Sequence, residues 1–179
     1  MNSCEEILQD IVCIVPIKSG ILGCSLPFNA GGKPTLSVNM LTISGASYNS
    51  VSSLVVLLRA RRCFLTEATV EGGTHAKSVI IEEKPSIKAT SKSGAMGRYF
   101  DTKVSAKSID DVESVTDFVN EVAGWPWFDL FLIDSDDNLY LLRGQRSASN
   151  IELNQALPSA NTHDIDLQIM SVNGIQKIE

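Results

Sequence analysis

Histidine and cysteine, the residues that most often build zinc sites and nucleophilic centres, are scarce in this chain. Its 179 residues include two histidines and four cysteines. No two cysteines form a Cys-x-x-Cys pair and each histidine stands alone, whereas zinc ligands usually occur in pairs at short spacing. We therefore expect no metal site, no Ser-His-Asp triad and reduced, partly buried thiols. The residues concerned are His75, His163, Cys4, Cys13, Cys24 and Cys63.

Basic residues are in deficit. The chain carries 15 lysines and arginines against 21 aspartates and glutamates, for a net charge of −6 and a pI of about 4.9. Affinity for a phosphate backbone requires a local surplus of lysine and arginine, so this composition disfavours nucleic-acid binding. The one tight basic cluster, Arg59, Arg61 and Arg62, lies inside an apolar stretch. That setting predicts a solvated or ion-paired strand face rather than a DNA-binding patch.

Long apolar runs are missing. A membrane-spanning helix needs about 18 consecutive apolar residues, and the longest candidate here, Leu54 to Leu58, ends at Arg59. The start of the chain, Met1 to Glu6, lacks the basic region followed by an apolar run that marks a secretory signal. These absences predict a protein that is made and folds in a cytoplasm, with no membrane contact.

Sequence patterns for phosphate binding and acid–base catalysis are incomplete. The glycine pairs at 20/23 and 94/97 lack the Gly-Lys-Ser/Thr ending of a phosphate loop, and Gly31-Gly32-Lys33 is followed by Pro34. The adjacent carboxylates Glu82-Glu83 and Asp110-Asp111 fit solvated surface. Neighbours on a strand point to opposite faces, so Glu82 and Glu83 could not act on one substrate. We predict no catalytic residue, no cofactor and no enzyme.

What the chain does contain is a series of β-type segments. Two Gly-, Ser- and Pro-rich stretches, near 18–34 and 44–53, predict flexible loops. Residues 54–70 could form one long strand, a bent pair or partly a helix. Pro85 cannot donate to a ladder, so its strand lies at an edge or bends there. The predicted strands span 11–17, 34–43, 78–89, 98–106, 127–133, 139–142, 150–153 and 165–169.

Residues 109–123 show a helical pattern. Six apolar residues recur at three- and four-residue steps on one face, and Gly124 followed by Trp125-Pro126 ends the pattern. Asp110 is the predicted cap, with Glu113 completing a capping-box-like start. Valine lowers helix propensity, so packing on the sheet that contains 127–133 must hold this helix. The apolar face consists of Ile109, Val112, Val115, Phe118, Val119 and Val122.

A strand, an acidic turn and a return strand follow the helix. Residues 127–133 are predicted as a strand that is apolar on both faces, and residues 134–138 read Asp-Ser-Asp-Asp-Asn. These turn residues match the first ligands of a calcium-binding loop, but Leu139 replaces the required glycine and Gln145 the required glutamate. We expect a plain hairpin turn, since Asp and Asn tolerate left-handed backbone and bond to nearby amides.

These patterns together predict one domain, 1–179, with a mostly-β fold, a β-sandwich or barrel, and one flanking α-helix at about 109–123. Residues 128–175 resemble the small virion proteins of tailed bacteriophages, especially tail-tube-like proteins. The shared pattern runs from Asp129 to Gly144 as an apolar strand, an Asp/Asn turn and a short strand, and closes with the alternating strand Asp164 to Met170. The resemblance implies a β-sandwich or barrel flanked by a helix, and it assigns no functional residue.

The resemblance also implies a function. A tail-tube subunit self-assembles into stacked rings, typically hexameric, and DNA passes through the lumen without specific binding. Such a protein assembles in the host cytoplasm and ends in the virion tail. Two alternatives remain: another neck, connector, terminator or packaged virion protein, and a small cytoplasmic ligand-binding domain. The pocket of that domain would lie between helix and sheet near Trp125, Trp127 and Tyr140.

Overall fold

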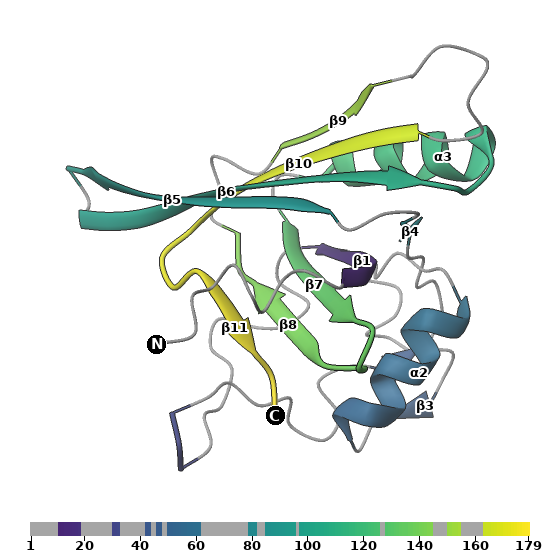
Figure 1. The fold of residues 1–179 in the computed structure, drawn as a ribbon, viewed down its shortest axis with the longest axis horizontal. Coiled ribbons are helices and arrows are strands. Elements are labelled where there is room, and N and C mark those ends of the chain that lie inside the picture. Colours follow the sequence, from purple (N-terminus) through teal and green to yellow (C-terminus); the bar gives the residue numbers. More distant parts are fainter. Residues whose placement is uncertain are drawn as a thin grey trace.

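The structure is a computed structural model of the full chain. It describes residues 11–18, 30–32, 42–43, 46–47, 50–61, 79–81, 85–95, 97–125, 128–144, 150–154 and 163–179. The described strands form two main antiparallel sheets that lie one above the other (Figure 1), together with a small pair, β2 (Thr42–Ile43) and β3 (Ala46–Ser47). The predicted mostly-β fold with a flanking helix is confirmed.

The first sheet has five strands in the order β11-β8-β7-β1-β4. Its centre is β7, and every residue of β7 and of β8 is buried, as the doubly apolar pattern predicts. Strand β1 continues through Pro16 to Lys18, one residue beyond the predicted end at Ile17. The bounds are β1 (Ile11–Lys18), β4 (Val79–Ile80), β7 (Phe128–Asp134), β8 (Leu139–Leu142) and β11 (Ile175–Lys177).

The second sheet has four strands in the order β5-β6-β10-β9. Strands β6 and β10 alternate as predicted: Thr102, Val104 and Ala106 are buried, while Lys103 between them is exposed. One face of this sheet is therefore wet. The bounds are β5 (Ser86–Gly94), β6 (Gly97–Ser108), β9 (Asn150–Asn154) and β10 (His163–Ser171).

Pro85 lies where the chain passes from one sheet to the other. The single strand predicted over 78–89 is two strands, since β4 is the edge of the five-stranded sheet and β5 the edge of the four-stranded sheet. Proline lacks the N–H that a continuous central strand needs, so its place between two edge strands follows from its chemistry. The predicted edge position is confirmed, since both strands that flank Pro85 are edge strands, whereas the predicted single strand is wrong.

The N-cap of helix α3 (Val112–Ala123) lies one residue later than predicted. Asp111 is the N-cap, and its carboxylate accepts bonds from the Ser114 N–H (2.9 Å) and the Ser114 hydroxyl (2.7 Å). The Asp110 assignment is wrong because Asp110 is buried, with its own N–H donated to the Ser108 hydroxyl at 3.1 Å. The prediction that both Asp110 and Asp111 are solvated therefore fails for Asp110.

A second helix, α2 (Val51–Arg61), includes the first part of residues 54–70, for which the sequence left strand and helix open. It begins inside the stretch predicted as a loop over 44–53, and it makes the strand assignment of Arg59 and Arg61 wrong. Leu54 and Val55 are its buried residues. Residues 62–70, most of the predicted loop 18–34 and most of the predicted strand 34–43 lie outside the described residues.

One hydrophobic cluster joins both sheets and α3. It contains Val115, Phe118, Val119 and Val122 from α3, and Phe118 is 1% exposed. The same cluster contains Phe128, Leu130 and Leu132 of β7, so helix and strand share a core, but the strand that α3 approaches most closely is β9 of the four-stranded sheet, which the sequence did not predict. Val112 and Ile109 are 54% and 50% exposed and are not part of this core.

Candidate interaction surface

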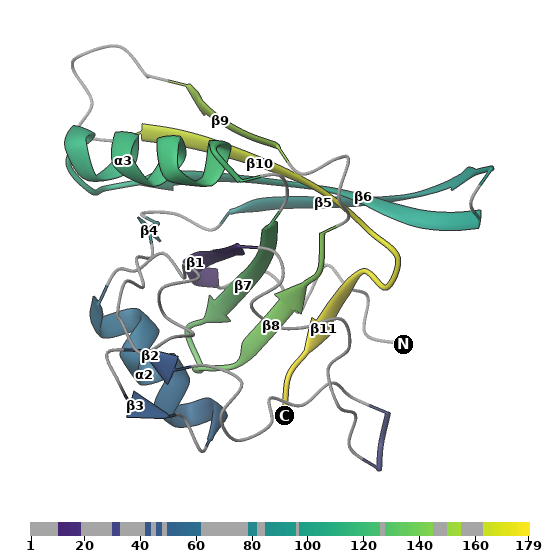
Figure 2. The same cartoon turned by 180° about the vertical axis from the view of Figure 1, so that it is seen from behind.

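A long hairpin formed by β5 and β6 extends past the rest of the molecule (Figures 1 and 2). Its strands pair from Ser86↔Ser105 to Gly94↔Gly97. Gly97 has φ of 103°, which a side chain would strain, so glycine at this turn is a backbone requirement. Every residue of β5 except Ile87 is exposed. The sequence signal for this feature is the Ser- and Lys-rich composition of 86–94. Such polar side chains favour a strand that is exposed to solvent on both faces.

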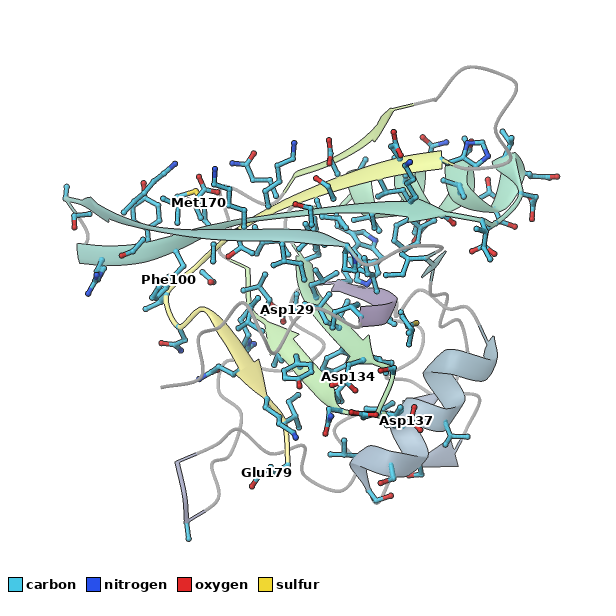
Figure 3. The ribbon with its side chains drawn as sticks, in the orientation of Figure 1. Phe100, Asp129, Asp134, Asp137, Met170 and Glu179 are labelled. Atoms are coloured by element: carbon cyan, nitrogen blue, oxygen red, sulfur yellow. The ribbon has the colours of Figure 1, made fainter. Side chains whose placement is uncertain are left out.

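The hydrophobic core ends near Phe100 of β6, which points toward the β10–β11 turn (Figure 3). A Cβ on Gly174 of that turn would lie 3.7 Å from the Phe100 ring, and Gly174 has φ of 65°. From Phe100 toward the tip, β6 has no fully buried residue. The outer hairpin therefore depends on its own ladder bonds and on exposed polar contacts.

Polar side chains connect three strands across the wet face of the four-stranded sheet. Lys92 Nζ donates to Asp101 Oδ2 at 2.5 Å, and Gln168 Nε2 donates to Asp101 Oδ1 at 3.0 Å. The hydrogen bond from Lys92, followed by that from Gln168, lowers the pKa of Asp101, and the same contact with Asp101 raises the pKa of Lys92. Met170 of β10 pairs with Asp101 on this face. The face is thus charged rather than apolar.

A second set of polar contacts lies further along the same face. Asp166 accepts a hydrogen bond from the Ser105 hydroxyl and an ion pair from Lys103 at 3.2 Å. Lys88 of β5 stands directly opposite Lys103, so two positive charges face each other across the ladder. Like charges at such positions disfavour pairing, and the ion pair between Lys103 and Asp166 offsets one of the two charges.

Asp129 is a buried carboxylate that sequence analysis did not single out. It is 3% exposed on β7, where its Oδ1 accepts the Gly144 N–H at 3.0 Å and its Oδ2 lies 3.6 Å from Arg143 Nε. Burial raises the pKa of Asp129 to about 6, against the opposing effects of Arg143 and Gly144. The signal was the single charge in an otherwise apolar strand. Through these contacts with Arg143 and Gly144, Asp129 fixes the position of the chain that follows β8.

The acidic sequence 134–138 forms the β7–β8 turn, as predicted. Asp134 Oδ1 accepts the N–H groups of Asp136 (2.9 Å) and Asn138 (2.8 Å), while Oδ2 accepts the Asn138 side-chain amide (2.8 Å) and the Tyr140 hydroxyl (3.1 Å). Asp137 adopts φ of 62°. Four donors occupy the lone pairs that a calcium ion would need, so the geometry favours a turn over a cation loop.

The aromatic residues expected near a ligand pocket are placed differently. Trp125 and Tyr140 are 9% and 5% exposed and belong to the hydrophobic cluster, and Trp127 lies outside the described residues. Burial, followed by the bond to Asp134, raises the pKa of Tyr140 to about 12. Both side chains therefore pack in the core, and Tyr140 also bonds to the hairpin turn.

The remaining candidates lie far apart or outside the described residues. Cys13 is buried in β1, His163 begins β10, and the glycines at 94 and 97 flank the β5–β6 turn. Among the described residues, no group of three or more His, Cys, Asp or Glu side chains gathers as a metal site. The candidates outside the described residues are Cys4, Cys24, Cys63, His75, Arg62, Lys33, the glycines at 20 and 23, Glu82, Glu83 and Gln145.

Comparisons of this chain with protein-family models, with curated proteins and with solved structures found no match. Neither helix in the described part of the chain has the length and apolarity needed to cross a membrane. The case for a function therefore rests on the geometry of the chain itself and on the sequence pattern noted above.

Proposed function

We propose that this chain is a structural subunit that assembles with copies of itself, and specifically a tail-tube protein of a tailed bacteriophage. The observation that carries the proposal is the β5–β6 hairpin, whose outer part extends past the core with exposed residues on both strands. Ordering each residue costs about 1–2 kcal/mol of backbone entropy, and an isolated two-stranded ribbon is marginal in water. A neighbouring subunit would supply the missing packing.

The sequence pattern of the C-terminal third makes the assembly more specific. In the proposed particle, subunits form rings that stack into a tube, the rings are hexameric, and DNA passes through the lumen. The net charge of −6 suits such a channel, since an acidic wall repels phosphates and lets DNA slide. Assembly would take place in the host cytoplasm before the subunit joins the virion. Copy number per particle separates a tube subunit from a connector or terminator.

The test is the oligomeric state of the purified full chain over a wide concentration range. Light scattering after size exclusion and negative-stain microscopy should show rings or tubes at high concentration. A species that stays monomeric at every concentration, with no growth after seeding, would overturn the proposal.

A shortened hairpin provides the matched variant. Deleting Lys92 and Ser93 with their ladder partners Tyr99 and Arg98 removes two pairs and leaves the Ser91↔Phe100 pair next to the Gly94↔Gly97 pair. This deletion spares Phe100 and the buried core, so the thermal midpoint should stay near that of the parent chain. Loss of assembly by a folded variant would identify the hairpin as the assembly element.

A further inference from the structure

Charge is segregated along residues 86–123. The β5–β6 hairpin, 86–108, contains five basic residues and one acidic residue, for a net charge of +4. The next fifteen residues, 109–123, contain five acidic residues and no basic one. In a chain of net charge −6, this places a basic segment directly before an acidic one. The charged residues are Lys88, Lys92, Arg98, Asp101, Lys103 and Lys107, then Asp110, Asp111, Glu113, Asp117 and Glu121.

The fold places the tip of the β5–β6 hairpin and α3 at opposite ends of the molecule, while the other end of β6 leads into α3. In Figure 1, whose horizontal direction is the longest axis, the β5–β6 tip is at the left and α3 is at the right. Figure 2 shows the same separation from behind. The tip of one copy therefore lies far from its own α3, and only another molecule can bring the two together.

The acidic surface is a row along α3. Glu113, Asp117 and Glu121 are exposed and fall at four-residue steps, which place them on one side of the helix. The last turn holds no basic residue, so Glu121 meets the negative end of the helix dipole without compensation. No ion pair within the described residues involves any of the three. Within one chain this row is repulsive.

The start of the same helix exposes apolar surface. Ile109 and Val112 are 50% and 54% exposed, and with Val56 and Val172 they make up the exposed large hydrophobic side chains among the described residues. Apolar side chains beside a row of charge are what a docked partner would cover. This observation is independent of the charge pattern, and it lies at the same end of the molecule.

The basic surface matches the acidic row in length. Lys88 and Lys92 project from one face of β5, and Lys103 stands opposite Lys88 on that face. Residues four apart on a strand are separated by about 13 Å, while Glu113 and Glu121, eight apart on a helix, are separated by about 12 Å. The Lys103 and Lys92 side chains are 58% and 47% exposed, so they reach solvent even though each is ion-paired within the chain, Lys103 with Asp166 and Lys92 with Asp101.

We propose that the basic face of the hairpin (Lys88, Lys92 and Lys103) in one copy docks on the acidic row of α3 (Glu113, Asp117 and Glu121) in the next copy. This inference deepens the proposed self-assembly and rests on it, because it names the two surfaces that meet. The surfaces differ, so the contact is head-to-tail and leads either to a closed ring or to an open filament.

Charge reversal on each surface tests this contact. The arm variant Lys88→Glu/Lys92→Glu and the helix variant Glu113→Lys/Asp117→Lys/Glu121→Lys should each weaken self-association at least tenfold in sedimentation velocity. A chain that carries both sets, or an equimolar mixture of the two variants, should regain assembly because every contact is again complementary. Raising the salt to 0.5 M should weaken assembly of the parent chain.

Matched controls make the same charge changes elsewhere. Lys177→Glu on β11 and Asp136→Lys on the β7–β8 turn alter exposed residues outside both surfaces and should leave assembly unchanged. Circular dichroism and thermal midpoints establish that every variant is folded. A pair of variants that assembles like the parent chain, or a combination that fails to restore assembly, overturns the docking contact while self-assembly itself stands.

Two further outcomes would also overturn the docking contact. A parent chain that never assembles refutes the proposed function and this contact together. Binding of a 20-base-pair DNA duplex that the arm variant loses, combined with normal assembly of that variant, would make nucleic acid the ligand of the hairpin and overturn the docking contact.

Discussion

The Tyr140 hydroxyl donates a 3.1 Å hydrogen bond to the Asp134 carboxylate, which links the second strand of the β7–β8 hairpin to its turn. The same carboxylate accepts two backbone N–H groups and one side-chain amide, and it is 7% exposed. Asp134→Ala should therefore lower the free energy of unfolding by about 2–3 kcal/mol, because it leaves several donors unsatisfied. Tyr140→Phe removes one bond and should cost about 1 kcal/mol. Urea denaturation measures both, and equal losses would contradict this network.

Calcium provides an independent check on this turn. Because four donors already occupy the Asp134 carboxylate, millimolar calcium should leave the thermal midpoint of the parent chain unchanged. A concentration-dependent rise in the midpoint that Asp134→Ala abolishes would show that the turn binds the cation.

Phe118 tests the assignment of the core. It is 1% exposed within the cluster shared by α3 and β7, so Phe118→Ala should cost about 3–5 kcal/mol in thermal or urea unfolding. Val112→Ala, at a half-exposed position of the same helix, is the control and should change stability little. If Phe118→Ala kept the midpoint and abolished assembly instead, this helix face would be an intersubunit contact.

We expect the free energy of unfolding to depend on pH because of Asp129. Its pKa is raised by burial from 3.8 to about 6 in the folded state, so the folded state holds the proton more tightly than the unfolded state. Stability contributed by the protonated group is fully present below pH 3.8 and is lost as pH rises to about 6, by about 3 kcal/mol in total.

The measurement is the difference in unfolding free energy between the parent chain and Asp129→Asn, taken from pH 4 to pH 7. The parent chain should lose stability relative to the variant as pH rises. Asp111→Asn serves as the control of opposite sign, since the bonds from Ser114 lower the pKa of Asp111 and its contribution is lost as pH falls. A difference between Asp129→Asn and the parent chain that stays constant with pH would contradict the raised pKa.

Gly174 tests the packing beneath the hairpin. Its φ of 65° is left-handed and its Cα faces the Phe100 ring, so Gly174→Ala should cost about 1–2 kcal/mol through backbone strain. Gly94→Ala, at a position outside the left-handed region, is the control. If the two variants lost the same stability, the conformation of the β10–β11 turn would not be the cause.

The sequence predicted local structure well where residues close together in the chain determine the conformation. The β7–β8 hairpin follows from an apolar run, an Asp/Asn turn and a return strand, and the wet face of β10 follows from its alternation. The end of α3 follows from Gly124 and Trp125. Its start was misplaced by one residue because Asp110 and Asp111 are equivalent as sequence, and only burial of Asp110 against Ser108 distinguishes them.

The amino-acid sequence by itself determined a mostly-β chain with a helix after residue 109, and it concentrated basic residues before that helix and acidic residues within it. Only the tertiary structure decided that Pro85 divides one predicted strand between two sheets, that Asp129 is buried, and that the tip of the basic hairpin and the acidic helix lie at opposite ends of the molecule. The physical reason is range: strand alternation and turn chemistry act between neighbours, whereas burial and the placement of charge depend on which sheets stack and on where the core ends.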